Sequence, residues 1–306
     1  MTKKSSKWSG IIVPMITPLE DRDTLDRDGL GRLIEHILHG GVHGLFVLGT
    51  TGEGPSLSYC LRKELIERTC RQVAGRVPVM VGITDTSFTE SIRISHVAAE
   101  AGASTVVLAP PYYFPAGQPE LCEYVEHMLD ELPLPVFLYN QPAYTKVLFE
   151  PDTVRKMADM KGVCGLKDSS CDMVYFHYLV QITRGHSDFS LLVGAEELLA
   201  EAVLLGGDGC VGGAANVCPD LLVRMYNAAV AQDMPEIIKL HHKIFELRKI
   251  YAHGHYRSSY LKGMKCALSC LGICSDFLAE PFHRFRASER DLVMRDLEAF
   301  GLLKHD

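Results

Sequence analysis

The feature that most constrains the fold of this chain is an alternation between short apolar runs and longer segments with helical periodicity. The apolar runs are rich in β-branched residues, and their apolar character is nearly continuous. Strands that are buried on both faces have this pattern, as in a parallel sheet covered by helices. Eight such runs occur, at residues 10–16, 44–49, 78–83, 104–109, 135–140, 163–167, 189–194 and 209–213.

The segments between the runs have the periodicity of amphipathic helices, as at residues 61–73, 89–102 and 150–160. Successive runs are spaced by about 20–35 residues, which is the size of a βα unit. Eight such units predict an α/β fold, the (β/α)₈ or TIM barrel. A doubly wound sheet is the alternative, but the first run is followed by "TPLED" and not by a glycine-rich nucleotide-binding turn.

The strand pattern ends near residue 220, and the rest of the chain has only helical segments. We expect these helices at residues 220–231, 235–250, 257–271 and 288–300. No low-complexity linker precedes them. We therefore expect a barrel over residues 1–225 and a C-terminal helical extension, residues 226–306, packed on the barrel.

Composition excludes several classes of partner. The formal net charge is −7, which argues against a broad nucleic-acid-binding surface. No apolar run reaches the roughly 18 residues that would cross a membrane. The N-terminal "MTKKSSKWSG" lacks the apolar segment of a secretory signal.

The 10 cysteines form no CxxC pair and no disulfide-framework spacing, which favours a reducing, cytoplasmic environment. Cys266, Cys270 and Cys274 recur every four residues, which predicts one side of a helix. Packing as small hydrophobic residues explains this stripe; a metal or redox role is the alternative.

Lys167 ends the sixth apolar run, in "GVCGLKDSS". The active site of a (β/α)₈ barrel lies at the carboxyl ends of the strands. Alternation places Lys167 on the same face as Val163 and Gly165, and the glycine leaves room for a long side chain inside the barrel. Burial favours a neutral amine, which can attack a carbonyl to form an imine. The alternative is a structural lysine paired with Asp168, although alternation places Asp168 on the opposite face.

Other strand ends offer supporting groups. Tyr139 ends the neighbouring run, and its phenol could relay protons or simply sit at the barrel rim. The turn "GTTGEG" at residues 49–54 could hold a small carboxylate, or it could be an ordinary turn that caps the next helix.

Two further motifs remain open. The tract "GGDGCVGG" at residues 206–213 could bind phosphate or make room for a substrate. His253 and His255 have a spacing that could bind a metal, although an exposed loop or helix start explains them equally.

Together, the strand ends resemble those of the dihydrodipicolinate synthase / N-acetylneuraminate lyase family. The motifs "GTTGEG", "PPYYF", "YNQPAYT" and "GLKDSS" occur in the order and spacing of that family, within a resemblance that runs from about residue 10 to about residue 300. The resemblance implies a barrel with a C-terminal helical extension, usually assembled as a homotetramer, a dimer of dimers. It also implies a lyase that forms a lysine imine with pyruvate or another 2-keto acid, with no metal or other cofactor.

The resemblance assigns the central roles by position. Lys167 matches the imine lysine, and Tyr139 matches the tyrosine that relays protons and contacts the pyruvyl carboxylate. Thr50 and Thr51 match the pair that binds this carboxylate, with Gly52 beside them in the same turn.

Three more positions match the periphery of the family's site. Tyr113 matches the tyrosine that, in many members, reaches the site of a neighbouring subunit. Gly194 and Val211 match residues that line the pocket behind the lysine.

Tyr144 departs from the pattern of the lysine-biosynthesis members, in which "YNxPxRT" carries an arginine at this place. A tyrosine has one hydroxyl and no fixed charge, whereas an arginine offers a bidentate fork. A neutral polar group suits a hydroxylated partner, so we expect reversible aldol cleavage of a 2-keto-3-deoxy sugar acid. The alternatives are 4-hydroxy-tetrahydrodipicolinate synthase, N-acetylneuraminate lyase, and a 2-keto acid dehydratase or deaminase. A barrel that binds keto acids without turnover and a phosphosugar isomerase remain further alternatives.

Overall fold

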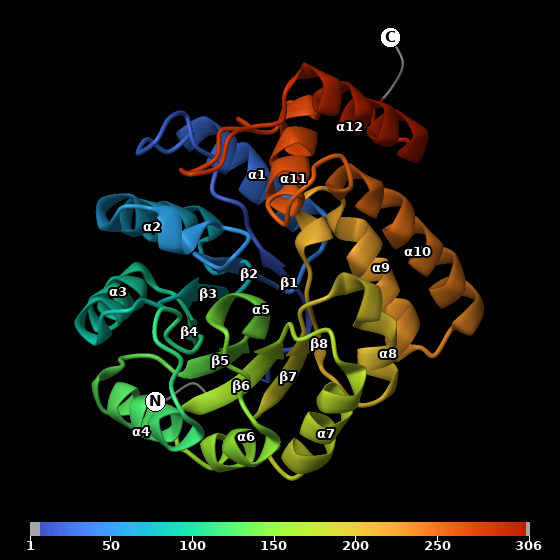
Figure 1. Ribbon diagram of the computed structural model, residues 1–306. Helices are drawn as coiled ribbons and strands as arrows, with labels where there is room; N and C mark the ends of the chain where they lie inside the picture. The colour runs from blue at the N-terminus through green and yellow to red at the C-terminus, as the bar shows by residue number, and fades with distance from the viewer. Residues whose placement is uncertain (1–6, 304–306) are drawn as a thin grey trace.

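Eight parallel strands close into a barrel in the computed structural model, which describes residues 7–303. Each strand pairs with the next one in the sequence, and β8 pairs with β1 (Figure 1). The strands are β1 (Gly10–Pro14), β2 (Gly44–Val47), β3 (Val79–Gly82), β4 (Thr105–Leu108), β5 (Val136–Asn140), β6 (Val163–Asp168), β7 (Ser190–Val193) and β8 (Gly209–Val211). The predicted (β/α)₈ barrel is confirmed, and every predicted run contains most of one strand.

Helices surround the barrel and connect its strands (Figure 1). They are α1 (Arg27–His39), α2 (Tyr59–Val73), α3 (Phe88–Ala101), α4 (Gln118–Glu131), α5 (Pro142–Thr145), α6 (Pro151–Ala158), α7 (Met173–Thr183), α8 (Leu199–Leu204) and α9 (Pro219–Val230). Local chemistry sets their ends. Ser58 caps α2 by accepting from the amide of Leu61, and α3 ends at Gly102 in the left-handed region.

The barrel separates two apolar cores. The larger core lies between the strands and the surrounding helices. The smaller core fills the barrel interior, and its members are Trp8, Ile12, Phe46, Met80, Val107, Ala109, Phe137, Tyr139, Cys164, Leu192 and Val211. Because both faces of every strand are covered, the strands read as continuous apolar runs in the sequence.

An irregularity in β6 changes which residues share a face. Val136 of β5 pairs with Val163, but Phe137 pairs with Gly165, so one extra residue is inserted in β6. Cys164 therefore joins the barrel interior, and Val163 packs against the outer core. The prediction that Val163 shares a face with Lys167 is wrong for this reason.

The C-terminal helices α10 (Met234–Leu247), α11 (Ser259–Cys270) and α12 (Ala287–Phe300) follow α9, and the short turn η4 (Arg248–Tyr251) separates the first two. They lie together beside α8, α9 and α1 (Figure 1). Helix α9 continues across residue 225, where we expected the barrel to end, and the division into two domains stays a prediction. Helix α11 ends at Cys270, so the predicted helical stripe includes Cys266 and Cys270 but not Cys274.

No helix within residues 7–303 is both long enough and apolar enough to span a membrane. Residues 1–6, which include most of the segment in which we expected no secretory signal, lie outside the described residues, as do residues 304–306.

Candidate active site

Lys167 projects into the barrel from the end of β6 and is only 6% exposed. Its Nζ lies 4.2 Å from the ring centroid of Tyr139 and 5.4 Å from that of Phe46. No carboxylate among residues 7–303 lies within ion-pair distance of Nζ. The amine therefore has aromatic neighbours and no fixed acidic partner, which leaves it available to a substrate.

Asp168 belongs to a separate network, so the alternative of a Lys167–Asp168 pair does not hold. Its carboxylate accepts hydrogen bonds from Nδ2 of Asn140 and from Oγ of Ser170, both at 2.8 Å. Burial raises the pKa of the Asp168 carboxyl. This network joins the ends of β5 and β6 on the face away from Lys167.

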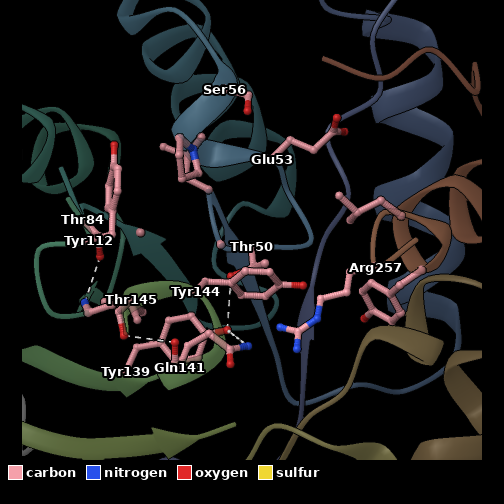
Figure 2. Close-up of a pocket in the computed structure, with 18 of the residues that line it drawn as sticks. Thr50, Glu53, Ser56, Thr84, Tyr112, Tyr139, Gln141, Tyr144, Thr145 and Arg257 are labelled. Atoms are coloured by element: carbon pink, nitrogen blue, oxygen red, sulfur yellow. Dashed lines mark hydrogen bonds between the residues drawn. The ribbon is translucent and has the colours of Figure 1, made fainter. Parts of the chain in front are cut away.

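Tyr139 is paired with Lys167 in the register of β5 and β6. Its hydroxyl lies 3.2 Å from Oγ1 of Thr50 and accepts a hydrogen bond from Nε2 of Gln141 at 3.3 Å (Figure 2). Burial raises the pKa of the phenol, but the positive charge of Lys167 and these hydrogen bonds outweigh it, so the pKa lies below its usual value. A phenol with a lowered pKa beside an amine suits proton transfer.

The turn after β2 carries Thr50 and Thr51 and is held in place from the C-terminal extension. Thr51 Oγ1 lies 3.5 Å from the hydroxyl of Tyr260, in α11. Glu53, in the left-handed region at φ 56°, accepts from the amide of Ala279 at 2.8 Å and forms a buried ion pair with Lys265. These contacts fix the two threonines at the mouth of the barrel.

Two adjoining cavities open around these groups. One, of about 380 Å³, is lined by Lys167, Thr51 and the predicted residues Gly194 and Val211. The other, of about 490 Å³, extends past Tyr112 (Figure 2). Both cavities share a wall, which consists of Thr50, Tyr139, Gln141, Tyr144, Tyr256, Arg257 and Tyr260.

Two predicted residues do not line these cavities. A side chain at Gly52 would place its Cβ 2.9 Å from the carbonyl oxygen of Met15, so this glycine permits tight folding of the turn. Tyr113 is 72% exposed, with its ring centroid 5.0 Å from that of Phe114. Its neighbour Tyr112 lines the larger cavity instead, and the role of Tyr113 in another subunit stays a prediction.

Sequence reasoning missed Glu196, which follows β7 and lines the cavity of Lys167. It is buried and accepts a hydrogen bond from the amide of Gly213 at 2.9 Å. Burial and repulsion from Glu197 raise the pKa of Glu196 to about 7. The signal was present in "VGAEE", where two acids follow a buried strand. Such a group can exchange a proton near neutral pH.

Tyr260 and Arg257 were also missed. Tyr260 lies in the first turn of α11, and Arg257 lies in the segment between η4 and that helix. Neither residue follows a strand of the barrel. Only the packing of the extension against the barrel brings them to the cavity, so no local pattern could have identified them.

The two remaining motifs gain no support as phosphate or metal sites. Residues 206–208 precede β8 and so lie at the amino end of the barrel, away from Lys167, where Asp208 pairs with Lys7 at 2.8 Å. Val211, at the other end of the same tract, lines the cavity of Lys167, which favours the interpretation that the tract makes room for a substrate. Nε2 of His253 lies 2.6 Å from Oδ2 of Asp296, which links this segment to α12. Residues 7–303 contain no cluster of three or more histidine, cysteine or acidic side chains that could hold a metal.

Comparisons with known proteins agree on one family. The model of the dihydrodipicolinate synthetase family matches residues 7–300. The solved dihydrodipicolinate synthase of Bacteroides thetaiotaomicron is 55% identical, with a TM-score of 0.93, and the match covers 95% of this chain and 98% of that one.

Two Escherichia coli proteins are also similar. The probable 2-dehydro-3-deoxy-D-pentonate aldolase YjhH is 30% identical over 97% of this chain and 99% of its own length. The solved structure of YagE in complex with pyruvate is 28% identical, with a TM-score of 0.91, over 97% of this chain and 100% of that one.

The barrel, the lysine at its mouth and these similarities define a lyase of the aldolase type. The chain belongs to the dihydrodipicolinate synthetase family.

Proposed function

We propose that this enzyme cleaves a 2-keto-3-deoxy sugar acid reversibly to pyruvate and an aldehyde through an imine on Lys167. One observation carries the proposal: an unpaired, buried amine lies 4.2 Å above the ring of Tyr139, whose hydroxyl contacts Thr50. The similarity to YagE, which has been solved in complex with pyruvate, supports the keto acid as the reacting group.

The residues suggest a complete sequence of steps. Nζ of Lys167 attacks C2 of the keto acid and water leaves, while the hydroxyls of Thr50 and Thr51 hold the C1 carboxylate. Tyr139 takes the proton of the C4 hydroxyl, and the C3–C4 bond breaks. C4 becomes the aldehyde carbon, and the electron pair left on C3 enters the enamine. Protonation of C3 and hydrolysis of the imine release pyruvate and restore the amine.

Tyr144 is the reason for choosing a sugar acid. Its side chain is half exposed and lines both cavities next to Tyr139. Burial and the neighbouring Tyr139 raise the pKa of its phenol, so the group stays neutral and can hydrogen-bond to substrate hydroxyls. The similarity to YjhH, named as a probable 2-dehydro-3-deoxy-D-pentonate aldolase, supports the same choice.

Trapping of the imine tests the mechanism. Pyruvate and borohydride should add a reduced pyruvyl group to Lys167, detected by mass spectrometry of its peptide. Lys167→Arg should lose both the adduct and pyruvate release from 2-keto-3-deoxy acids, while keeping the melting temperature within a few degrees. An unmodified Lys167 in the native enzyme would refute the proposal.

A second function is favoured by the 55% identity with the solved dihydrodipicolinate synthase. That reaction would condense pyruvate with aspartate semialdehyde on the same lysine. Comparing kcat/KM for aspartate semialdehyde with that for simple hydroxyaldehydes distinguishes the synthase function from the sugar-acid aldolase function. Faster turnover of aspartate semialdehyde would replace the sugar-acid assignment and leave the imine mechanism intact.

The homotetramer remains part of the proposal. The exposed aromatic pair Tyr113 and Phe114 suits a contact with another copy of the chain. Sedimentation of the native enzyme tests this assembly.

A further inference from the structure

Arg257 is a feature of the cavity that the proposed mechanism leaves unused. It lies in the segment between η4 and α11 and belongs to the wall shared by the two cavities. Figure 2 shows its guanidinium directed toward Tyr144. Both side chains line the wall shared by the two cavities.

The guanidinium of Arg257 has no acidic partner. Among residues 7–303, no carboxylate lies within ion-pair distance of it and none of its nitrogens donates a hydrogen bond. Arg248, which lines the cavity of Lys167, is paired with Glu197. Arginine presents a rigid fork of donors that matches a carboxylate, so Arg257 is suited to binding an anion.

The placement of Arg257 identifies which part of a substrate it can reach. The keto acid end is assigned to Lys167 and to the threonine turn, inside the barrel mouth. Tyr144 and Arg257 lie on the wall where this cavity meets the larger one past Tyr112. A chain that extends away from the imine therefore meets Tyr144 and Arg257.

We propose that Arg257 binds a carboxylate at the far end of the substrate, so that the sugar acid is a diacid. The inference rests on the proposed imine chemistry and deepens it. Hydroxyls in the middle of the chain would face Tyr144, and the terminal carboxylate would face Arg257. The aldehyde released on cleavage would then be an acid aldehyde.

A matched pair of aldehydes tests this inference in the condensation direction. Tartronate semialdehyde and glyceraldehyde differ only in a carboxylate in place of a hydroxymethyl group. The native enzyme should condense pyruvate with tartronate semialdehyde at a higher kcat/KM. Arg257→Gln should lower that value about 10- to 100-fold, the loss expected for a charge-assisted bidentate contact. The same variant should leave the value for glyceraldehyde within about twofold.

Two more variants serve as controls. Arg257→Lys should keep part of the preference for tartronate semialdehyde over glyceraldehyde, because lysine keeps the positive charge but not the bidentate geometry of the guanidinium. Arg155→Gln removes the same charge from the exposed surface of α6 and should leave kcat/KM unchanged for both aldehydes. Glyceraldehyde 3-phosphate distinguishes a phosphate site from a carboxylate site. A higher kcat/KM for this aldehyde than for tartronate semialdehyde would overturn the carboxylate assignment.

The outcomes separate this inference from the proposed function. Borohydride trapping of pyruvate on Lys167 in Arg257→Gln shows that the imine site is intact. An equal loss for both aldehydes, or no loss, would overturn the role of Arg257 while the aldolase stands. A loss confined to tartronate semialdehyde would support the role of Arg257 as a carboxylate site.

Discussion

At the residue scale, the reactivity of the site depends on what surrounds each titratable group. Lys167 has aromatic neighbours and no carboxylate, whereas Asp168, the next residue, is held by Asn140 and Ser170. Because successive side chains of a strand point to opposite faces, the amine of Lys167 faces the barrel interior while the carboxyl of Asp168 joins a structural network on the other face. Sequence reasoning identified this separation because it needs only alternation at the end of one strand.

Glu196 gives stability a pH dependence. The pKa of its carboxyl is about 7 in the folded enzyme, above the ordinary value of 4.5. The folded state therefore keeps a proton that the unfolded chain has lost, and stability falls as pH rises from about 4.5 to about 7. We expect a loss of about 3 kcal/mol over this range, absent from Glu196→Gln.

Urea unfolding midpoints between pH 4.5 and pH 8 measure this effect. Glu123→Gln, on the exposed face of α4, makes the same chemical change at the surface and should keep the native pH dependence. Parallel pH curves for the native enzyme and Glu196→Gln would contradict the assignment.

At the element scale, the irregularity in β6 determines how Lys167 enters the barrel. The extra residue puts Cys164 inside and brings Gly165 beneath the ring of Phe137. Alternation correctly placed Gly165 below Lys167, but it failed for Val163 because a bulge shifts the period of two. No residue type in "GVCGLK" predicts this shift, because it arises from the way β6 pairs with β5.

Gly165 should not tolerate a side chain. A Cβ at this position would lie 2.5 Å from the carbonyl oxygen of Ser190 and within the contact distance of the Phe137 ring. We expect Gly165→Ala to destabilise the fold by about 1–3 kcal/mol and to lower imine formation, because β6 must shift. Chemical denaturation and borohydride trapping measure the two effects.

Gly185→Ala is the matched control, because a Cβ at Gly185 meets nothing within 4 Å. Its stability should stay within about 0.5 kcal/mol of the native value. A similar loss in both variants would show that packing beneath Lys167 is not the cause.

At the scale of the whole molecule, the C-terminal extension completes the candidate active site. Helix α11 supplies Tyr260 to Thr51 and Lys265 to Glu53, and the segment after α11 supplies the amide of Ala279. Arg257 enters from the same part of the chain. The barrel mouth is therefore built from residues more than 200 positions apart in the sequence.

The buried pair of Lys265 and Glu53 should be essential to stability. Both side chains are almost fully buried, and removing one would leave the other charge uncompensated. We expect Lys265→Met to destabilise the enzyme by about 3–5 kcal/mol, and Glu53→Gln in the same chain to recover part of this loss. Denaturant unfolding of the single and double variants measures the coupling.

Lys262→Met provides the comparison within α11. Lys262 is also buried, but it forms no ion pair among the described residues. Its replacement should therefore lower the free energy of unfolding far less than that of Lys265. Equal losses for Lys262→Met and Lys265→Met would contradict the role of the buried pair.

The residue pattern alone predicted the barrel and the centre of its candidate site. Strands buried on both faces must be apolar throughout, and parallel strands end at one edge, so Lys167, Tyr139 and Thr50 could be placed together from their positions at strand ends. Long-range packing, by contrast, produces the bulge in β6, the buried pair of Glu53 and Lys265, and the presence of Arg257 in the cavity. These features depend on contacts between segments far apart in the chain, and such contacts leave no periodic signal in the residues that make them.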